Sequence, residues 1–103
     1  MTKILFDRSV AKFIASLEKP TIAKALRIID LLEKFSHQLN LPHGKKMKPN
    51  LFELRIRGQQ EVRIFYTFHQ EGSIVMLHGF VKKSQKTPKQ EIRRAEKKLK
   101  DLT

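Results

Sequence analysis

The stretch LFELRIRGQQEVRIFYTF, residues 51–68, constrains the fold more than any other part of the sequence, because apolar and polar residues alternate along it. Phe52, Leu54 and Ile56 occupy every second position, and this period of two is typical of a β-strand with one buried face. The following GQQ predicts a turn, and EVRIFYTFH predicts a second strand. Because the second strand is apolar at positions on both faces, we expect it to lie in the centre of a sheet.

The N-terminal part of the chain predicts one strand and two helices. Residues 3–6, KILF, form a short apolar run, and Asp7 can cap the helix that follows. Apolar residues then recur at the spacing of one helical face, at Val10, Phe13, Ile14 and Leu17. Pro20 is suited to open a second helix, which the apolar spacing carries to about residue 38. Residues 40–50, NLPHGKKMKPN, contain two prolines, a glycine and three lysines and predict a loop.

The C-terminal part predicts a third strand and a helix. An EG turn precedes SIVMLHGFVKK, which is rich in Ile, Val and Phe and apolar on both sides. TPKQ, residues 87–90, has the pattern of a helix start, with Thr87 as the cap, Pro88 first in the helix and Gln90 completing a capping box. The predicted fold is therefore α+β: an N-terminal strand, a two-helix hairpin, a three-stranded antiparallel meander and a C-terminal helix. We expect residues 1–103 to form a single domain.

Composition limits the partners and the chemistry. Lys and Arg total 22 against 10 Asp and Glu, which gives a formal net charge of +12. Such an excess favours a nucleic acid, an anionic membrane surface or an acidic protein as partner. There is no cysteine, which excludes disulfides and cysteine-ligated metals. No run approaches the ~18 apolar residues of a membrane span, and the N-terminus lacks a secretory signal. We expect a soluble cytoplasmic protein with no membrane partner.

Metal and nucleotide sites have no support in the sequence. The histidines at positions 37, 43, 69 and 78 show no paired spacing, and acidic residues do not cluster around them. No glycine-rich phosphate-binding loop is present. We therefore expect no metal and no cofactor, and we expect His78, in the third strand, to be packed and hydrogen-bonded.

A strip of arginines with one carboxylate is the strongest candidate for a site. Glu53, Arg55 and Arg57 share a strand face by their alternation, and Arg63 joins them if the hairpin register permits. The strip is either an ordinary solvated face with cross-strand ion pairs or a site for an anion. The position of Arg63 in the most apolar strand favours the second interpretation, because a buried guanidinium needs a partner. Phosphate would be a suitable one, since its oxygens match the planar fork of the guanidinium.

Such a strip has the chemistry to cleave RNA without a metal. Cleavage next to a 2′-hydroxyl passes through a phosphorane with extra negative charge, which fixed cations stabilise more than they stabilise the ground state. A carboxylate or a lysine near the 2′-oxygen would act as the base, and a lysine near the 5′-oxygen as the acid. Other basic residues are candidates for RNA contact, namely Lys45, Lys46, Lys48, Arg57 and Lys86.

The runs GKKMKPNLFELRIRGQQEVRIFYTF and IVMLHGFVKKSQKTPKQEIRRA together resemble the RelE/ParE toxin superfamily, and are most similar to its phage-related HigB-like addiction-module killer proteins. The points of similarity are LFELR followed by VRIFY, a strand ending LHGFVKK, and TP opening a basic helix. The resemblance covers essentially the whole chain. It implies the toxin of a type II toxin–antitoxin system, typically a ribosome-dependent mRNA endonuclease that needs no metal or cofactor. It also implies a cognate antitoxin, usually of the helix-turn-helix type, with which the toxin commonly represses its own promoter DNA.

The resemblance also implies roles for particular residues. Glu53 and Arg55 fall where the second strand of these toxins presents reactive or phosphate-binding side chains, and Arg63 matches their most recurrent active-site arginine. Lys82 and Lys83 fall where relatives place a basic residue or a histidine. Many relatives carry a catalytic tyrosine or histidine near the C-terminus, and this chain has neither there. The identities of the general acid and base therefore stay open.

Two other functions remain possible from the sequence. A gyrase-directed toxin of the ParE type shares the fold and needs no cleavage residues. A non-enzymatic nucleic-acid-binding domain would stack bases on Phe65 and Phe68. We expect these aromatics and Tyr66 to be core residues instead, because they alternate with other apolar positions.

Overall fold

The computed structural model describes residues 2–102. Its elements are β1 (Lys3–Phe6), α1 (Arg8–Ala15), α2 (Lys19–Phe35), β2 (Gly44–Lys48), β3 (Leu51–Ile56), β4 (Val62–His69), β5 (Ser73–Val81) and α3 (Lys89–Asp101). Two short 3-10 helices, η1 (Ser36–Gln38) and η2 (Gln70–Gly72), continue α2 and join β4 to β5. None of the helices in this range is long and apolar enough to cross a membrane.

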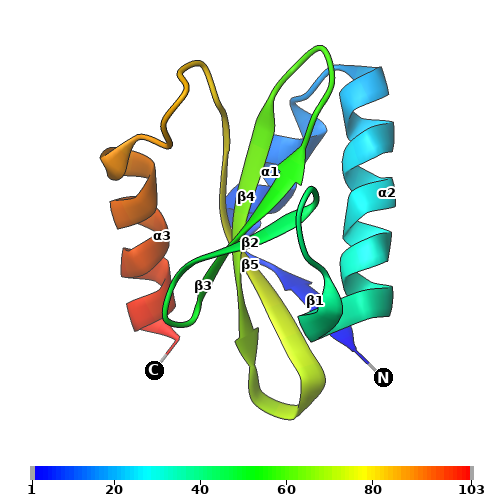
Figure 1. Ribbon diagram of the computed structural model, residues 1–103. Coiled ribbons are helices and arrows are strands. Elements are labelled where there is room, and N and C mark those ends of the chain that lie inside the picture. Colours follow the sequence, from blue (N-terminus) through cyan, green and yellow to red (C-terminus); the bar gives the residue numbers. More distant parts are fainter. Residues whose placement is uncertain (1, 103) are drawn as a thin grey trace.

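The strands form one sheet in the order β1-β5-β4-β3-β2. The meander of β3, β4 and β5 is antiparallel, as predicted, and β1 joins its far side parallel to β5. The helices α1 and α2 lie on one side of the sheet and α3 lies on the other (Figure 1). The predicted α+β fold is thereby confirmed.

The prediction of a loop over residues 40–50 was wrong in its central part, because Gly44–Lys48 forms the edge strand β2. An edge strand pairs on one side only, so it tolerates lysines that would be excluded from a central strand. Lys45 and Lys46 are exposed, and the register shifts between Lys46 and Lys48. Gly44 begins the strand where a side chain has little room, since a Cβ there would lie 3.1 Å from the Tyr66 hydroxyl.

The period of two along the strands produces two different sheet faces. The face under α1 and α2 carries the larger apolar core, and Leu54, Ile64 and Tyr66 are each at most 1% exposed there. The face under α3 carries a smaller core in which Phe65 and Leu77 pack near Ala95 of α3. Along β3 and β4 the polar residues alternate with the residues of the larger core, so their side chains lie on the opposite face, under α3.

The helix starts match the predictions at two of three places. Asp7 caps α1 by accepting a hydrogen bond from the Ser9 N–H at 2.9 Å, and Pro20 lies in the first turn of α2. The prediction for α3 was wrong. Pro88 rather than Thr87 is its N-cap residue, and the described residues make no side-chain hydrogen bond that caps the helix, so the capping box does not form. The Thr87 hydroxyl instead donates to a distant carboxylate, Glu53 Oε2, at 2.9 Å.

Candidate anion-binding site

The hairpin register brings two arginines face to face. Arg55 of β3 is the direct partner of Arg63 of β4, and Arg63 is in turn the partner of Phe80 of β5. Like charges directly opposite each other destabilise a sheet unless an anion lies between them. The register therefore places Arg63 beside Arg55 and Glu53, as the alternation allowed but did not require.

Glu53 supplies that anion from inside the protein. Its side chain is fully buried, and its Oε1 accepts a hydrogen bond from Arg55 Nε at 3.2 Å. The same Oε1 lies 3.6 Å from Arg63 Nε, within ion-pair distance, while Oε2 accepts from Thr87. Both carboxylate oxygens are thus engaged by the protein. These contacts fit a group that holds two arginines in place, and direct catalysis by Glu53 stays a prediction.

Arg63 is a buried cation whose hydrogen bonds are incomplete. Its side chain is 3% exposed, and one terminal nitrogen donates to Glu61 Oε2 at 2.9 Å and to the Val62 carbonyl at 3.3 Å. Its Nε has no hydrogen-bond partner among the described residues, since the 3.6 Å separation from Glu53 is too long for one. A buried polar donor without a partner costs free energy, and such groups are concentrated at functional sites.

Lys82 completes this group at the end of β5. Its backbone N–H donates to the Glu61 carbonyl at 2.6 Å, which ties the ends of β4 and β5 together. Partial burial lowers the pKa of the Lys82 ammonium, and the positive charge of Arg63 lowers it further. We call Glu53, Arg55, Glu61, Arg63 and Lys82 the ionic cluster. Its three cations exceed its two carboxylates, so an additional anion would be attracted to it.

A comparison with known protein families bears directly on this arrangement. The family described as phage-derived protein Gp49-like (DUF891) matches residues 12–100, which include the whole ionic cluster. The chain belongs to the phage-derived Gp49-like family. This is a family of toxins from toxin–antitoxin systems, so the toxin part of the resemblance in the sequence is confirmed. No curated protein sequence matches the chain significantly.

Other predicted site residues of this Gp49-like chain lie outside the ionic cluster. Lys83 and Lys86 are exposed in the segment between β5 and α3, and Lys45 and Lys46 are exposed on β2. Lys48 pairs with Glu96 of α3 at 3.2 Å. Arg57 follows the end of β3, and within residues 2–102 it forms no ion pair.

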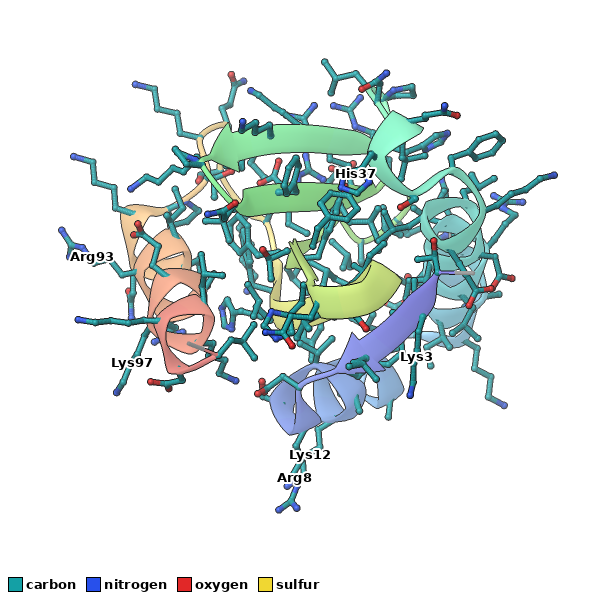
Figure 2. The ribbon with its side chains drawn as sticks, turned by 90° about the horizontal axis from the view of Figure 1, so that it is seen from below. Lys3, Arg8, Lys12, His37, Arg93 and Lys97 are labelled. Carbon is teal, nitrogen blue, oxygen red and sulfur yellow. The ribbon has the colours of Figure 1, made fainter. Side chains whose placement is uncertain are left out.

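The positive charge of the Gp49-like chain is spread over the surface rather than confined to the ionic cluster. Arg93 and Lys97 project from α3 away from the sheet (Figure 2). Lys3, Arg8 and Lys12 reach out from the β1 and α1 side of the molecule in the same view. The net charge therefore favours anionic partners in general, and only the geometry of the ionic cluster marks a particular place.

The predictions for His78 and the aromatic residues can be compared with the structure. His78 Nε2 lies 2.8 Å from Glu91 Oε1, so this histidine is packed and hydrogen-bonded as predicted. Phe65 and Tyr66 are core residues, as predicted, while Phe68 is only partly buried and stacks on His37 with ring centroids 3.7 Å apart. Burial raises the pKa of Tyr66 to about 12, so its hydroxyl is poorly suited to proton transfer.

Two members of the site were not identified from the sequence. Glu61 lies two residues before Arg63, and the period of two would have placed both on one face. Thr87 had no local signal for its contact with Glu53, because the two residues are far apart in the chain. Within residues 2–102, no three His, Asp or Glu side chains are grouped so that they could hold a metal ion.

Proposed function

We propose that the chain is a toxin of a type II toxin–antitoxin system of the RelE/ParE superfamily, and that it cleaves messenger RNA at the ionic cluster. The observation that carries the proposal is the state of Arg63, a cation that is 3% exposed and whose Nε has no hydrogen-bond partner in the part of the chain that the structure describes. A guanidinium held by Glu53 is preorganised, so it can stabilise charge that develops on a phosphate without reorganising first.

The reaction that fits this cluster is transfer of the phosphate to the neighbouring 2′-oxygen. The 2′-oxygen forms a bond to phosphorus while its proton passes to a base, and the bond between phosphorus and the 5′-oxygen breaks. The leaving 5′-oxygen takes a proton from an acid, which yields a 2′,3′-cyclic phosphate and a 5′-hydroxyl. Arg55 and Arg63 stabilise the phosphorane, whose negative charge exceeds that of the starting phosphate.

Glu61 and Lys82 are the groups best placed for the two proton transfers. The Glu61 side chain is 39% exposed, in contrast to Glu53, and its carboxylate already contacts Arg63. It is the candidate base. Lys82 is the candidate acid, since a lysine with a lowered pKa gives up its proton more readily than an ordinary lysine.

The proposal includes the partners of such a toxin. A cognate antitoxin, of the helix-turn-helix type in the HigB-like branch, would neutralise the toxin and bring it to promoter DNA. The substrate would be messenger RNA on the ribosome, in the cytoplasm. The net charge of +12 suits both an acidic antitoxin segment and the RNA.

Cleavage on programmed ribosomes tests the proposal directly. Arg63→Ala should lower the cleavage rate ~10²–10³-fold, because one preorganised donor to the transition state is lost. Arg63→Lys should restore little, since a point charge cannot replace the planar fork. Arg94→Ala is the matched control, because Arg94 is 54% exposed on α3 and lies outside the ionic cluster. A folded Arg63→Ala protein that cleaves at the wild-type rate would rule out the catalytic role.

The pH profile tests the role of Lys82. As the acid, Lys82 must be protonated, so the cleavage rate should fall as pH rises through its pKa, which is lower than that of an ordinary lysine. Lys82→Arg should keep RNA binding, lower the rate ~10²–10⁴-fold and abolish this alkaline fall. An unchanged alkaline fall in Lys82→Arg would assign the titration to another group.

A gyrase-inhibiting toxin of the ParE type is the second candidate. The observation that favours it is the internal use of Glu53, whose two oxygens are engaged by Arg55 and Thr87 and leave no free carboxylate at the centre of the cluster. Mapping of messenger RNA ends after induction separates the two candidates. Cuts within translated messages support the endonuclease, and DNA damage without such cuts supports the gyrase inhibitor.

A further inference from the structure

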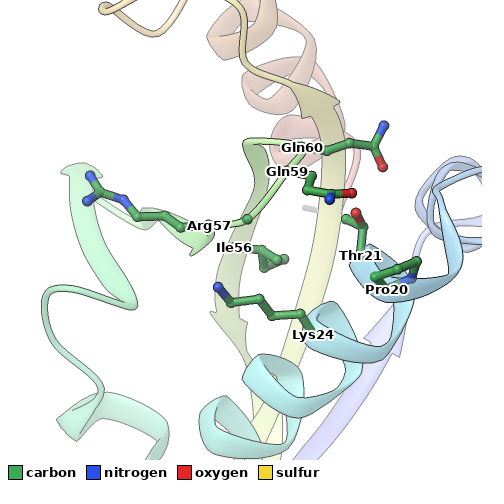
Figure 3. Close-up of a pocket in the computed structure, with 8 residues that line it drawn as sticks. Pro20, Thr21, Lys24, Ile56, Arg57, Gln59 and Gln60 are labelled. Atoms are coloured by element: carbon green, nitrogen blue, oxygen red, sulfur yellow. The ribbon is translucent and has the colours of Figure 1, made fainter.

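Two adjoining hollows lie at the end of β3, near the ionic cluster. One has a volume of about 120 Å³ and lies between the start of α2 and the turn after β3, where Lys24 and Arg57 contribute to its walls. The other has a volume of about 90 Å³ and is lined by Lys24, His43, Arg55 and Arg57, among others. In Figure 3 the Lys24 side chain runs beside Ile56 toward the end of the strand, and Arg57 extends away from the same turn. Lys24 and Arg57 therefore belong to both hollows.

No carboxylate of the described residues balances these two cations. Neither hollow has an Asp or a Glu among its lining residues. Within residues 2–102, Lys24 forms no ion pair, and neither does Arg57. In the ionic cluster, by contrast, Arg55 and Arg63 each contact a glutamate, so Lys24 and Arg57 differ from that cluster. Concave surface with cations and no internal counter-charge attracts an anion from solution.

The two cations are held by the fold rather than carried on a free loop. Gln60 Oε1 accepts a hydrogen bond from the Glu18 N–H at 3.1 Å, which fastens the turn to the beginning of α2. Lys24 lies on α2 near that contact, and a Cβ at Gly58 in the turn would be 4.0 Å from its ammonium nitrogen. The spacing between α2 and the turn, from which the two side chains extend, is thus held by this contact.

Arg55 connects these hollows to the ionic cluster. It lines the smaller hollow and also donates to Glu53 at 3.2 Å. An anionic chain whose reacting phosphate lies at Arg63 would therefore have a second cationic position close by, across the end of the sheet. Contacts to backbone phosphates carry no sequence information, but they fix the position of the chain.

We propose that Lys24 and Arg57 form a second anion site, which binds a neighbouring phosphate of the RNA whose cleavage occurs at the ionic cluster. This inference rests on the proposed function. The site positions the substrate and does not touch the reacting atoms. Its loss should raise KM and leave kcat nearly unchanged, whereas the loss of Arg63 should lower kcat.

The test uses binding and cleavage by Lys24→Gln and Arg57→Gln. The binding probe is a fully 2′-O-methylated messenger oligonucleotide, free and on programmed ribosomes, which the protein cannot cleave. Each variant should bind about fivefold to tenfold more weakly, and for the free oligonucleotide the slope of log K against log salt should decrease by about 0.7. Arg27→Gln is the matched control, since Arg27 is an exposed residue of α2 that lines neither hollow, and it should resemble the wild type.

The outcomes separate this site from the proposed function. If the wild type cleaves RNA and Arg63→Ala does not, but Lys24→Gln and Arg57→Gln retain the wild-type KM and salt slope, the second site is overturned and the cleavage proposal stands. If the two variants weaken antitoxin binding and leave RNA binding unchanged, the site serves an acidic protein and the inference is wrong. If the wild type neither binds nor cleaves RNA, both proposals fail together.

Discussion

The two faces of the sheet come from the same strands but differ in what they bury. On the α1 and α2 face, Leu54 and Ile64 are opposite each other and are fully buried in a continuous apolar core. One residue away along each strand, Arg55 and Arg63 are opposite each other on the α3 face, where Glu53 is buried with them. Apolar burial stabilises the fold at ~25 cal/mol per Å², whereas removing charges from water costs free energy even when they are paired.

The difference indicates which face folds the chain and which face serves another purpose. Helices α1 and α2 cover their face and complete its core. On the other face, α3 begins at Lys89, just beyond Thr87, so the ionic cluster lies past its N-terminal end. When most of a fold follows the usual rules of apolar packing, a single buried cluster of charges is expected to be a functional site.

The largest expected effect comes from removing the buried counter-charge. Glu53→Ala should lower the free energy of unfolding by ~3–5 kcal/mol, because it removes the buried carboxylate beside Arg63 and leaves that guanidinium only the partly exposed Glu61 as a counter-charge. Replacing both partners, as in Glu53→Leu with Arg63→Met, should recover most of that loss, although RNA cleavage should not return. Urea unfolding of the three proteins measures the effect.

Leu54→Ala is the matched control on the opposite face. It should cost ~2–5 kcal/mol by leaving a cavity, and no change on the α3 face should recover it. A Glu53→Ala protein as stable as the wild type would contradict the comparison, because the ionic cluster would then need no internal counter-charge.

The fold was largely predictable because its signals are local. Alternation in residues 51–56 and the helical spacing after Asp7 depend only on near neighbours, and both were correct. The edge strand β2 was missed because it is rich in lysine, and a short lysine-rich segment has the composition of a loop. Its strand structure comes from pairing with β3, which the local sequence does not show. The prediction that Thr87 caps α3 was wrong. Its hydroxyl donates a hydrogen bond to Glu53, which is too far away in the sequence for local spacing to reveal the contact.

The site was predictable in its composition but not in its geometry. Alternation placed Glu53 and Arg55 on one face, and the register, which the turn length left open, decided that Arg63 joins them. Burial of Glu53 depends on Thr87 and on the packing of three strands, so its internal role could not be seen in the sequence. Lys24 comes from a helix that the hairpin pattern does not include.

A smaller effect is expected where α1 meets the sheet. A Cβ on Gly79 of β5 would lie 2.6 Å from an aromatic carbon of Phe13, so Gly79→Ala should cost ~1–3 kcal/mol through overpacking. Gly58→Ala is the control at the polar end of the sheet, because a Cβ there meets only the Lys24 side chain at 3.8 Å. It should change the free energy of unfolding by no more than ~0.5 kcal/mol. Equal costs at the two glycines would show that α1 can shift to make room.

The cap of α1 should contribute ~1 kcal/mol, so Asp7→Ala should destabilise by about that amount. Partial burial by itself would raise the pKa of Asp7, but hydrogen bonds from Lys98 and Ser9 outweigh it and hold the pKa below the ordinary 3.8. The stabilisation is therefore complete above pH 3.8 and is lost as pH falls through the lower pKa of the folded protein. The other carboxylates titrate in both proteins, so thermal melts between pH 2 and pH 6 should show the stability difference between the wild type and Asp7→Ala shrinking as the pH falls. The exposed Asp30→Ala serves as control, with a change of at most ~0.5 kcal/mol.

The smallest effect is expected for the ion pair between Lys48 and Glu96, which joins β2 to α3 at 3.2 Å. Its side chains are 50% and 42% exposed, whereas Arg63 and Glu53 are almost fully buried, so the two pairs compare the same charges in water and in the protein interior. A double-mutant cycle with Lys48→Ala and Glu96→Ala should give a coupling of ~0.2–1 kcal/mol. That coupling should disappear in 1 M salt, because exposed charges are screened over about 3 Å at that concentration. A coupling above ~2 kcal/mol that persists in 1 M salt would contradict this expectation. It would mean that the exposed pair of Lys48 and Glu96 is screened from solvent as strongly as the buried pair of Arg63 and Glu53.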